Sequence, residues 1–360
     1  MKLVFGALVV VLFVGPAAPI SADQSDQRIE AFWGLLHESI VIDELKLSAD
    51  QKSKFFALRD DWDLRYFRTR NQKRDVARPA VIALVEEARE ATAGVLNERQ
   101  RRRLLEIEFR RMGTGSFLMP EMDPALRLTD DLKSQIATIM AENREAEKQA
   151  ILKSKEDKTS AGALEGRLRA LRIAEQRKVL AKLTPAQQDA WKRYLGDKFD
   201  VERLGNPTFR APDLIDSGHW VNSEGVSSES LRGKVVVVHF YAFGCINCIH
   251  NYPAYLDWQS RFKGRDFVMV GIHTPETKAE RDVAEVKRKA AAEKFEFPVL
   301  VDVDAQNWDA WGNSIWPAVY VLDKQGRLRY LWTGELNWQG ATGEAQMRKH
   351  IEELLAEKGA

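Results

Sequence analysis

Cys245 and Cys248 are the only cysteines in the chain, and two residues separate them. A run of β-branched and aromatic residues over 235–241 predicts a strand that leads into the pair, and a helical pattern follows it. Backbone amides and the dipole at the first turn of a helix favour a thiolate over a thiol. We therefore expect Cys245 to be the attacking sulfur of a redox reaction.

Cys248 follows on the same helix face, within reach of a disulfide with Cys245. A thiol in that place can displace a partner bound to Cys245 by closing the ring, so we expect Cys248 to be the resolving thiol. Such exchange uses the two sulfurs themselves. The sequence therefore predicts catalysis without a cofactor or a metal.

Other uses of the cysteine pair are less favoured. A structural disulfide across so small a loop would restrict the unfolded chain by only about 2 kcal/mol. A zinc site requires two more strong ligands, and the chain has no further cysteine. Attachment of a c-type haem requires histidine directly after the second cysteine, where Ile249 stands instead.

The first 22 residues have the pattern of a secretory signal peptide. Lys2 precedes an apolar run over 3–14, and a segment of small residues ends at Ser21–Ala22. The run is shorter than the roughly 20 apolar residues of a membrane-spanning helix, so cleavage is favoured and an uncleaved anchor is the alternative. We expect a periplasmic or otherwise extracytoplasmic protein, which meets a membrane only if this segment is retained.

The length and composition indicate two globular domains, with 44% hydrophobic and 30% charged residues in a chain of 360. The 54 Lys and Arg residues nearly balance the 53 Asp and Glu residues. This balance gives no electrostatic reason to expect nucleic acid or an anionic membrane surface as a partner.

Residues 23–200 have the periodicity of an all-α domain. Apolar residues recur at three- to four-residue spacing among charged ones, and Gly and Pro are few. A helix break is expected at Arg78–Pro79, and residues 201–210 are expected to be a linker. The expected helices cover 26–45, 48–76, 80–94, 97–112, 129–156, 163–181 and 184–196.

A short motif recurs at several of these helix starts. Residues 47–51, 96–100 and 183–187 share Leu, a capping residue, two variable positions and Gln, and 128–132 is a degenerate copy. Ser, Asn or Thr at the N-cap accepts from an amide of the first turn, and Gln can return the bond. The motif also resembles the LTxxQ motif of small periplasmic stress chaperones, which implies a partner-binding helical module as an alternative to simple capping.

The C-terminal part, 211–360, alternates strand-like and helix-like runs in the order βαβαββα. This order predicts an α/β domain with parallel crossovers first and an antiparallel hairpin last. The expected strands are Val235–Tyr241, Phe267–Ile272, Val299–Val301, Val319–Leu322 and Leu328–Trp332. The expected helices are 246–262, 277–294 and 344–357.

Five separated motifs in residues 208–357 resemble the thioredoxin-like (redoxin) domains of the TlpA and DipZ type, and they occur in the family's order. The resemblance implies a multidomain protein with an all-α N-terminal region and a C-terminal α/β thioredoxin-like fold. It also implies thiol-disulfide oxidoreductase activity. The motifs are Ala211–Leu214, Leu231–Val238, Cys245–Cys248, Gly271–Glu276 and Trp316–Ala318.

The same resemblance points to three further site residues. Pro317 corresponds to the cis-proline loop that lies against the disulfide and offers backbone to an extended substrate, and Trp316 is the expected substrate contact. Members of the family commonly carry Asp or Glu six residues before the first cysteine, where this chain carries His239. Strand alternation places His239 on one face with Tyr241. We expect His239 either to accept the proton of the resolving thiol near neutral pH, because burial favours the neutral imidazole, or only to pack in the core.

Together these features predict an exported thiol-disulfide oxidoreductase that exchanges with protein thiols and is reset by an upstream redox partner. The resemblance favours a reductase, while the direction itself depends on the relative stability of the dithiol and disulfide forms. A peroxidase of the related peroxiredoxin type is less favoured, because Ala242 stands where its motif requires Thr or Ser. The remaining alternative is a helical envelope-stress chaperone or binding protein with an accessory redox domain.

Overall fold

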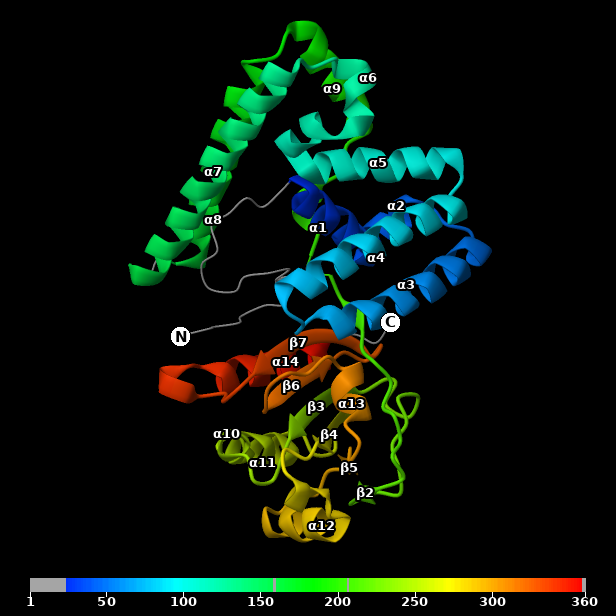
Figure 1. Ribbon diagram of the computed structural model, residues 1–360, viewed down its shortest axis with the longest axis vertical. Helices are drawn as coiled ribbons and strands as arrows, with labels where there is room; N and C mark the ends of the chain where they lie inside the picture. Colours follow the sequence, from blue (N-terminus) through cyan, green and yellow to red (C-terminus); the bar gives the residue numbers. More distant parts are fainter. Residues whose placement is uncertain (1–23, 158–159, 206, 358–360) are drawn as a thin grey trace. The chain divides into compact units, whose positions relative to one another are not determined.

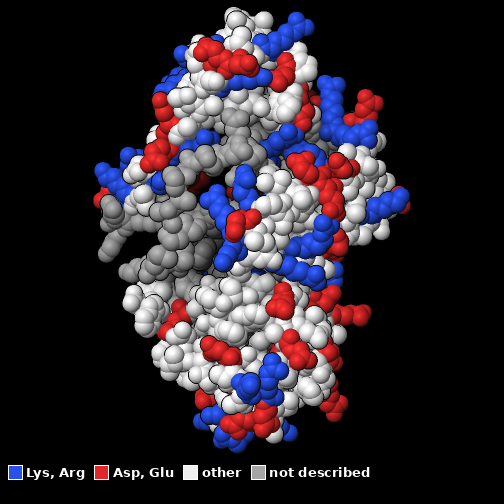
Figure 2. Space-filling view, in the orientation of Figure 1, with Lys and Arg blue, Asp and Glu red and all other residues white. Residues whose placement is uncertain are grey.

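The computed structural model describes residues 24–157, 160–205 and 207–357 (Figure 1). The expected signal peptide, residues 1–22, lies outside these ranges. Within them, we find no helix with both the length and the apolar character needed to cross a bilayer. Acidic and basic side chains are interspersed on the face in view in Figure 2, in keeping with the balanced charge of the sequence.

The chain divides into two compact units. One unit combines Ala49–Thr92 with the chain from residue 207 on, and the other combines the helices before Ala49 with Ala93–Gly205. The sequence analysis places all of 23–200 in one helical domain. The structure instead groups Ala49–Thr92 with the sheet, because aromatic side chains of this segment pack against the sheet unit.

The first unit is built on a seven-stranded mixed sheet with the order β1-β7-β6-β3-β4-β5-β2. The central strand, β3, pairs in parallel with β4 and antiparallel with β6. All five expected strands are present, and two edge strands of two residues each are too short for a sequence pattern to indicate. The strands are β1 Phe209–Arg210, β2 Trp220–Val221, β3 Val235–Tyr241, β4 Phe267–His273, β5 Val299–Val301, β6 Ala318–Leu322 and β7 Arg327–Thr333.

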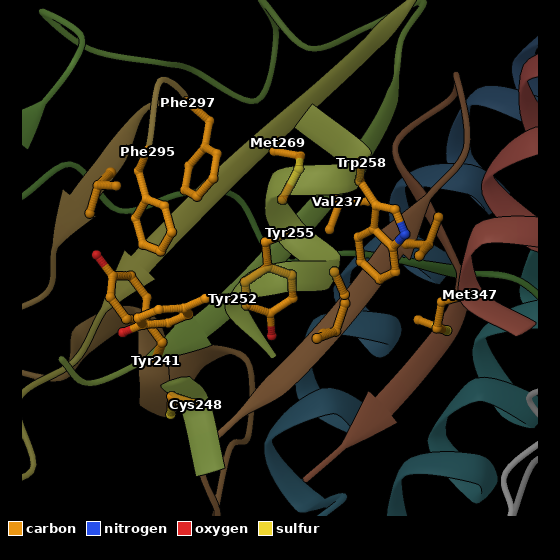
Figure 3. Close-up of a cluster of buried hydrophobic side chains, with 14 of the residues drawn as sticks. Val237, Tyr241, Cys248, Tyr252, Tyr255, Trp258, Met269, Phe295, Phe297 and Met347 are labelled. Atoms are coloured by element: carbon orange, nitrogen blue, oxygen red, sulfur yellow. The ribbon is translucent and has the colours of Figure 1, made fainter. Parts of the chain in front are cut away.

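One face of this sheet packs on helices that lie between or after its strands in the chain. Val235, Val237 and Tyr241 of β3 lie in a buried cluster with side chains of α11, α12 and α14, and Figure 3 shows part of that cluster. The expected helix 246–262 is two helices, because Pro253 has no N–H for the turn between them. The helices are α10 Ile246–Ile249, α11 Tyr252–Arg261, α12 Val283–Ala292, α13 Gln306–Ala310 and α14 Gly343–Ala356, with 3-10 segments η4 Lys278–Arg281 and η5 Trp338–Gly340.

The opposite face carries Phe240 and Tyr320, whose rings contact Trp311 directly after α13. Parallel strands require cover on both faces, and α13 has only five residues. Helix α3, Ala49–Thr69, adds cover: its Phe67 meets the Trp311 ring edge-on, with centroids 6.4 Å apart. This contact explains why the helical segment belongs to the sheet unit.

Helix α4, Arg74–Val95, follows α3 after a turn at 70–73. The break expected at Arg78–Pro79 is therefore wrong, since Pro79 lies inside α4. A proline there removes one backbone hydrogen bond of the helix. The turn falls earlier because Arg70 and Asn71 bond to the sheet domain, a long-range contact that local sequence does not reveal.

The second unit is all-α, as expected. Phe109, Phe117, Ile136, Val179 and Trp191 are central members of its buried core. Its helices are α1 Gln24–His37, α2 Ser39–Glu44, α5 Glu98–Met112, α6 Asp123–Leu126, α7 Asp130–Glu156, α8 Ala161–Leu180 and α9 Pro185–Tyr194, with 3-10 segments η1 Gly113–Leu118, η2 Pro120–Met122 and η3 Val201–Arg203.

Two copies of the repeated motif form complete capping boxes. Asn97 and Gln100 exchange side-chain and backbone bonds at the start of α5, and Thr184 and Gln187 do so at the start of α9. Each glutamine also reaches a carbonyl near the end of another helix: Gln100 donates to Leu45 (3.2 Å), and Gln187 donates to Leu126 (3.0 Å). The motif thus fixes helix starts and ties neighbouring helices together.

Candidate active site

Strand β3 delivers the first cysteine to the start of α10. Cys245 is the N-cap residue of that helix, and its carbonyl accepts from the amides of Cys248 (3.0 Å) and Ile249 (3.1 Å). Both thiols are free; Cys245 is partly exposed and Cys248 is fully buried. This difference in exposure is what attack by Cys245 and resolution by Cys248 would require.

The environment of Cys248 favours its protonated form. Burial raises the pKa of the Cys248 thiol, and a hydrogen bond with Cys245 raises it further. A backbone hydrogen bond from Ala242 opposes these effects, while the negative charge of Glu276 adds to them. In Figure 3 Cys248 lies next to Tyr241 at the edge of the drawn side chains, and both residues belong to the buried cluster. Cys248 is therefore a neutral thiol at neutral pH and is poorly suited to be the first nucleophile.

A buried carboxylate that the sequence analysis missed braces the loop before Cys245. Glu280 accepts from the Gly244 amide (2.8 Å), the Glu276 amide (2.9 Å) and the Thr277 amide (2.7 Å). Burial acts to raise the pKa of Glu280, but these hydrogen bonds outweigh it and hold the pKa below its usual range. The signal in the sequence is the Thr277-x-x-Glu280 capping box, which the structure forms.

Gly244 leaves the space that the Glu280 carboxylate occupies. A Cβ at residue 244 would lie 2.8 Å from Glu280 Oε1, closer than a carbon and an oxygen can approach without a shift. Glu280 thus links the turn after β4 to the residue that precedes Cys245.

We expect Glu280→Gln to lower the free energy of unfolding by about 2 kcal/mol at pH 7, because hydrogen bonds to a charged acceptor are lost. The depressed pKa of Glu280 stabilises the fold above the carboxyl's unfolded pKa of about 4.3, and that contribution disappears as the pH falls through the folded value. The variant should therefore show a weaker loss of stability below about pH 4. Denaturant unfolding at several pH values measures this. Glu296→Gln, at an exposed ion pair with Lys263, is the control and should leave the profile unchanged.

His239 lies where strand alternation predicts, on the cluster side of β3. Its ring centroid is 4.3 Å from that of Tyr255 and 5.1 Å from that of Phe297. The side chain is fully buried, and neither ring nitrogen has a hydrogen-bond partner in the described structure. Burial lowers the pKa of His239 to about 3. Desolvation thus keeps the imidazole neutral between pH 5 and 8, and its role as proton acceptor for the resolving thiol stays a prediction.

We expect His239→Ala to lower the free energy of unfolding by about 3 kcal/mol, because it empties a ring-sized space in the core. The rate at which a mixed disulfide resolves should keep the same pH dependence between 5 and 8. Single-turnover measurements on wild type and variant test this. Loss of a pH-dependent step in the variant would instead support the role of proton acceptor.

A second buried imidazole, His273 at the end of β4, was not among the predicted site residues. Its ring stacks on Phe243 at 5.2 Å and meets Tyr241 edge-on at 5.3 Å. Burial lowers the pKa of His273 to about 4, against the opposing charge of Glu280. Because Phe243 immediately precedes Gly244 in the chain, His273 packs directly against the segment that leads into Cys245.

Trp316 and Pro317 lie directly before β6. The peptide bond between them is cis, as the resemblance implies. The Trp316 ring stacks on Trp308 with centroids 4.0 Å apart, and Trp316 and Cys245 are both partly buried residues packed against the same core cluster. Trp316 and Cys245 thus border the same buried core.

Comparison with known proteins shows which family the C-terminal domain matches. The sequence model described as the AhpC/TSA family matches residues 207–331. The C-terminal domain is an AhpC/TSA-family, thioredoxin-like domain. The Mycobacterium tuberculosis protein DipZ is 35% identical over 128 residues, which cover 35% of this chain and 18% of DipZ. This chain thus matches less than a fifth of the length of that curated relative.

Two further relatives match over most of their own length. The thiol-disulfide oxidoreductase YkuV of Bacillus subtilis is 27% identical over 146 residues, 41% of this chain and 94% of YkuV. A solution structure of a thioredoxin-like protein in the oxidized form is 28% identical and covers 42% of this chain and 97% of its own, with a TM-score of 0.37. The redoxin domain thus has thiol-disulfide oxidoreductases among its relatives.

Proposed function

We propose that this protein is an exported thiol-disulfide reductase that uses Cys245 and Cys248 on protein disulfides. The observation that carries the proposal is the pairing of a partly exposed sulfur at the start of α10 with a buried, neutral thiol one turn later. Thiol-disulfide exchange needs one accessible attacking sulfur and one sulfur that acts only after a mixed disulfide has formed.

The reaction balances without a cofactor. The Cys245 thiolate attacks one sulfur of a substrate disulfide, a mixed disulfide forms, and the other substrate sulfur leaves as a thiolate. Cys248 then loses its proton and attacks the Cys245 sulfur, which releases the second substrate thiol. The substrate gains two electrons and the Cys245–Cys248 pair becomes a disulfide. An upstream dithiol of the envelope would return two electrons to the pair.

Charge around the pair supports the reductase direction. A strong oxidant of this family type stabilises its reduced form as a thiolate. Here burial raises the pKa of Cys248, and the negative charge of Glu276 raises it further. The charge of Glu276 thus disfavours a thiolate at Cys248. We expect a reduction potential near that of thioredoxin, about −270 mV, and a value near −120 mV would contradict the direction.

Exposed apolar side chains near the cysteines support a polypeptide as substrate. Ile246 in α10 is 60% exposed, and Ile315, directly before Trp316, is 50% exposed. An isolated exposed isoleucine is common, but one directly after Cys245 and one directly before Trp316 offer apolar contacts for an extended chain. Reduction of insulin disulfides by the purified protein, abolished by Cys245→Ser, tests the activity directly.

The extracytoplasmic location is part of the same proposal and rests on the pattern of residues 1–22. Expression of the full chain in a bacterium followed by N-terminal sequencing of the protein in the periplasmic fraction tests it. A chain that starts near Asp23 supports export with cleavage. A full-length chain in the membrane fraction would indicate the uncleaved anchor.

The chaperone alternative has its own structural support in the second unit. Side chains on α7 and α8 leave apolar surface exposed, with Leu152 at 45% and Ile173 at 49%. A hollow beside them has a volume of about 530 Å³, lined by Ala150, Leu152 and Leu171 among others. Suppression of aggregation that survives Cys245→Ser and is lost in Leu152→Asp would favour this function.

A further inference from the structure

We propose that helix α3 positions the loop that carries Trp316 and Pro317, through Arg70 and Asn71 at its end. The inference rests on the proposed function, because it concerns how a protein disulfide meets the redox site. A segment that precedes the redox domain by more than a hundred residues in the chain thereby contributes to substrate binding by that domain.

Arg70 bonds both to the turn after α13 and to strand β6. Its Nη2 donates to the Trp311 carbonyl (2.7 Å) and to the Tyr320 hydroxyl (2.7 Å). The guanidinium also lies over the rings of Phe67 and Tyr320, 4.7 Å and 5.2 Å from their centroids. Charge-assisted bonds combined with cation–π contacts hold one geometry more firmly than apolar packing alone.

Asn71 adds a further hydrogen bond, which its Nδ2 donates to the carbonyl of Gly312. Gly312 has a φ of +59°, and a Cβ there would lie 2.2 Å from the Phe67 carbonyl oxygen. Glycine is therefore required both for the backbone conformation and for the close approach of α3. The turn after α13 is shaped to receive the end of this helix.

The helix is anchored independently of that turn. The Asp63 carboxylate accepts from the Arg210 amide of β1 (2.7 Å), and the Tyr66 ring stacks on Phe209 at 5.3 Å. These contacts fix α3 on the edge strand β1. Arg70 and Asn71 are thus presented to the turn from a rigid support.

A continuous set of contacts leads from the turn to Trp316. The Tyr320 hydroxyl, which accepts from Arg70, donates to Asn313 Oδ1 (2.7 Å). The backbone N–H of Asn313 in turn donates to the Trp308 carbonyl (3.0 Å). The Trp308 ring stacks on Trp316. Residues 311–313 are held through α3, and only two residues separate them from Trp316.

A loop that samples several positions binds an extended substrate only in the fraction of molecules that hold the competent one. The apparent dissociation constant rises by the inverse of that fraction. Loss of the α3 contacts should therefore weaken binding of a protein disulfide, while a small disulfide that needs no backbone contact reacts as before.

The test compares insulin with a small aromatic disulfide, using the full-length chain. Asn71→Asp is isosteric and places an acceptor against the Gly312 carbonyl; Arg70→Met removes the guanidinium and keeps an apolar stem. Arg65→Met is the matched control on α3, since Arg65 makes an exposed ion pair with Glu87. Thermal melts establish which variants are folded, and Asn71→Asp serves if Arg70→Met is not.

We expect Arg70→Met and Asn71→Asp each to raise KM for insulin about tenfold, because Arg70→Met loses a charge-assisted hydrogen bond and Asn71→Asp sets a carboxylate against the Gly312 carbonyl. The kcat for insulin and the rate with the small disulfide should stay within about twofold of wild type. The control should match wild type on both substrates. An unchanged KM for insulin, or equal losses on both substrates, would overturn the positioning role. Wild-type protein that reduces neither disulfide would instead refute the proposed function.

Discussion

Cys248→Ser is expected to stop turnover and to leave the substrate covalently attached to Cys245. The variant keeps the attacking sulfur but has no second sulfur to close the ring, so the mixed disulfide persists. We expect multiple-turnover reduction of insulin to fall by roughly a hundredfold or more. Non-reducing electrophoresis should show a complex that a reductant separates into its two proteins. Mass analysis of complexes trapped in an envelope extract would identify the physiological partner.

Cys245→Ser is the matched control for this trap. It leaves only the buried Cys248, whose pKa is raised by burial, so no complex should accumulate. Equal trapping by both variants, or trapping through Cys248 alone, would reverse or remove the assigned roles.

The placement of the cysteine pair between a strand and a helix was accessible to sequence reasoning because its signals are local. The run Val235–Tyr241 is buried along its whole length and forms a strand with the bounds that the sequence predicts. The cysteines follow it directly, and Cys245 occupies the N-cap of α10. Adjacent residues set both the strand and the helix start, so composition and spacing were sufficient.

Features that depend on distant segments were missed for a common physical reason. Glu280 contacts Gly244 across 36 positions, and Arg70 contacts Tyr320 across 250. Neither pairing leaves a periodic pattern in the local sequence. The pKa of His239 likewise depends on how completely neighbouring rings exclude water, which strand alternation cannot specify.

The same long-range packing limits how the redox domain can be separated from the rest of the chain. A fragment that starts at residue 205 contains every strand of the sheet but lacks α3. Phe209 and Trp311 then lose their ring contacts with Tyr66 and Phe67. Exposure of roughly 200 Å² of aromatic surface costs about 5 kcal/mol, a large part of the total stability of about 5–15 kcal/mol typical of a domain.

We therefore expect the fragment 205–360 to unfold at least 15 °C below the full chain or to aggregate, because a loss of about 5 kcal/mol is several times the ~1 kcal/mol that shifts Tm by a few degrees. The control is a full chain in which residues 145–172 are replaced by a short turn, which shortens α7 and α8 in the other unit. That variant should keep its small-disulfide activity and the melting of the sheet unit. Cooperative melting of the fragment at the temperature of the full chain would show that α3 is dispensable for the redox fold. Instability of the fragment alone, with the shortened chain intact, would show that the segment that contains α3 is part of that fold.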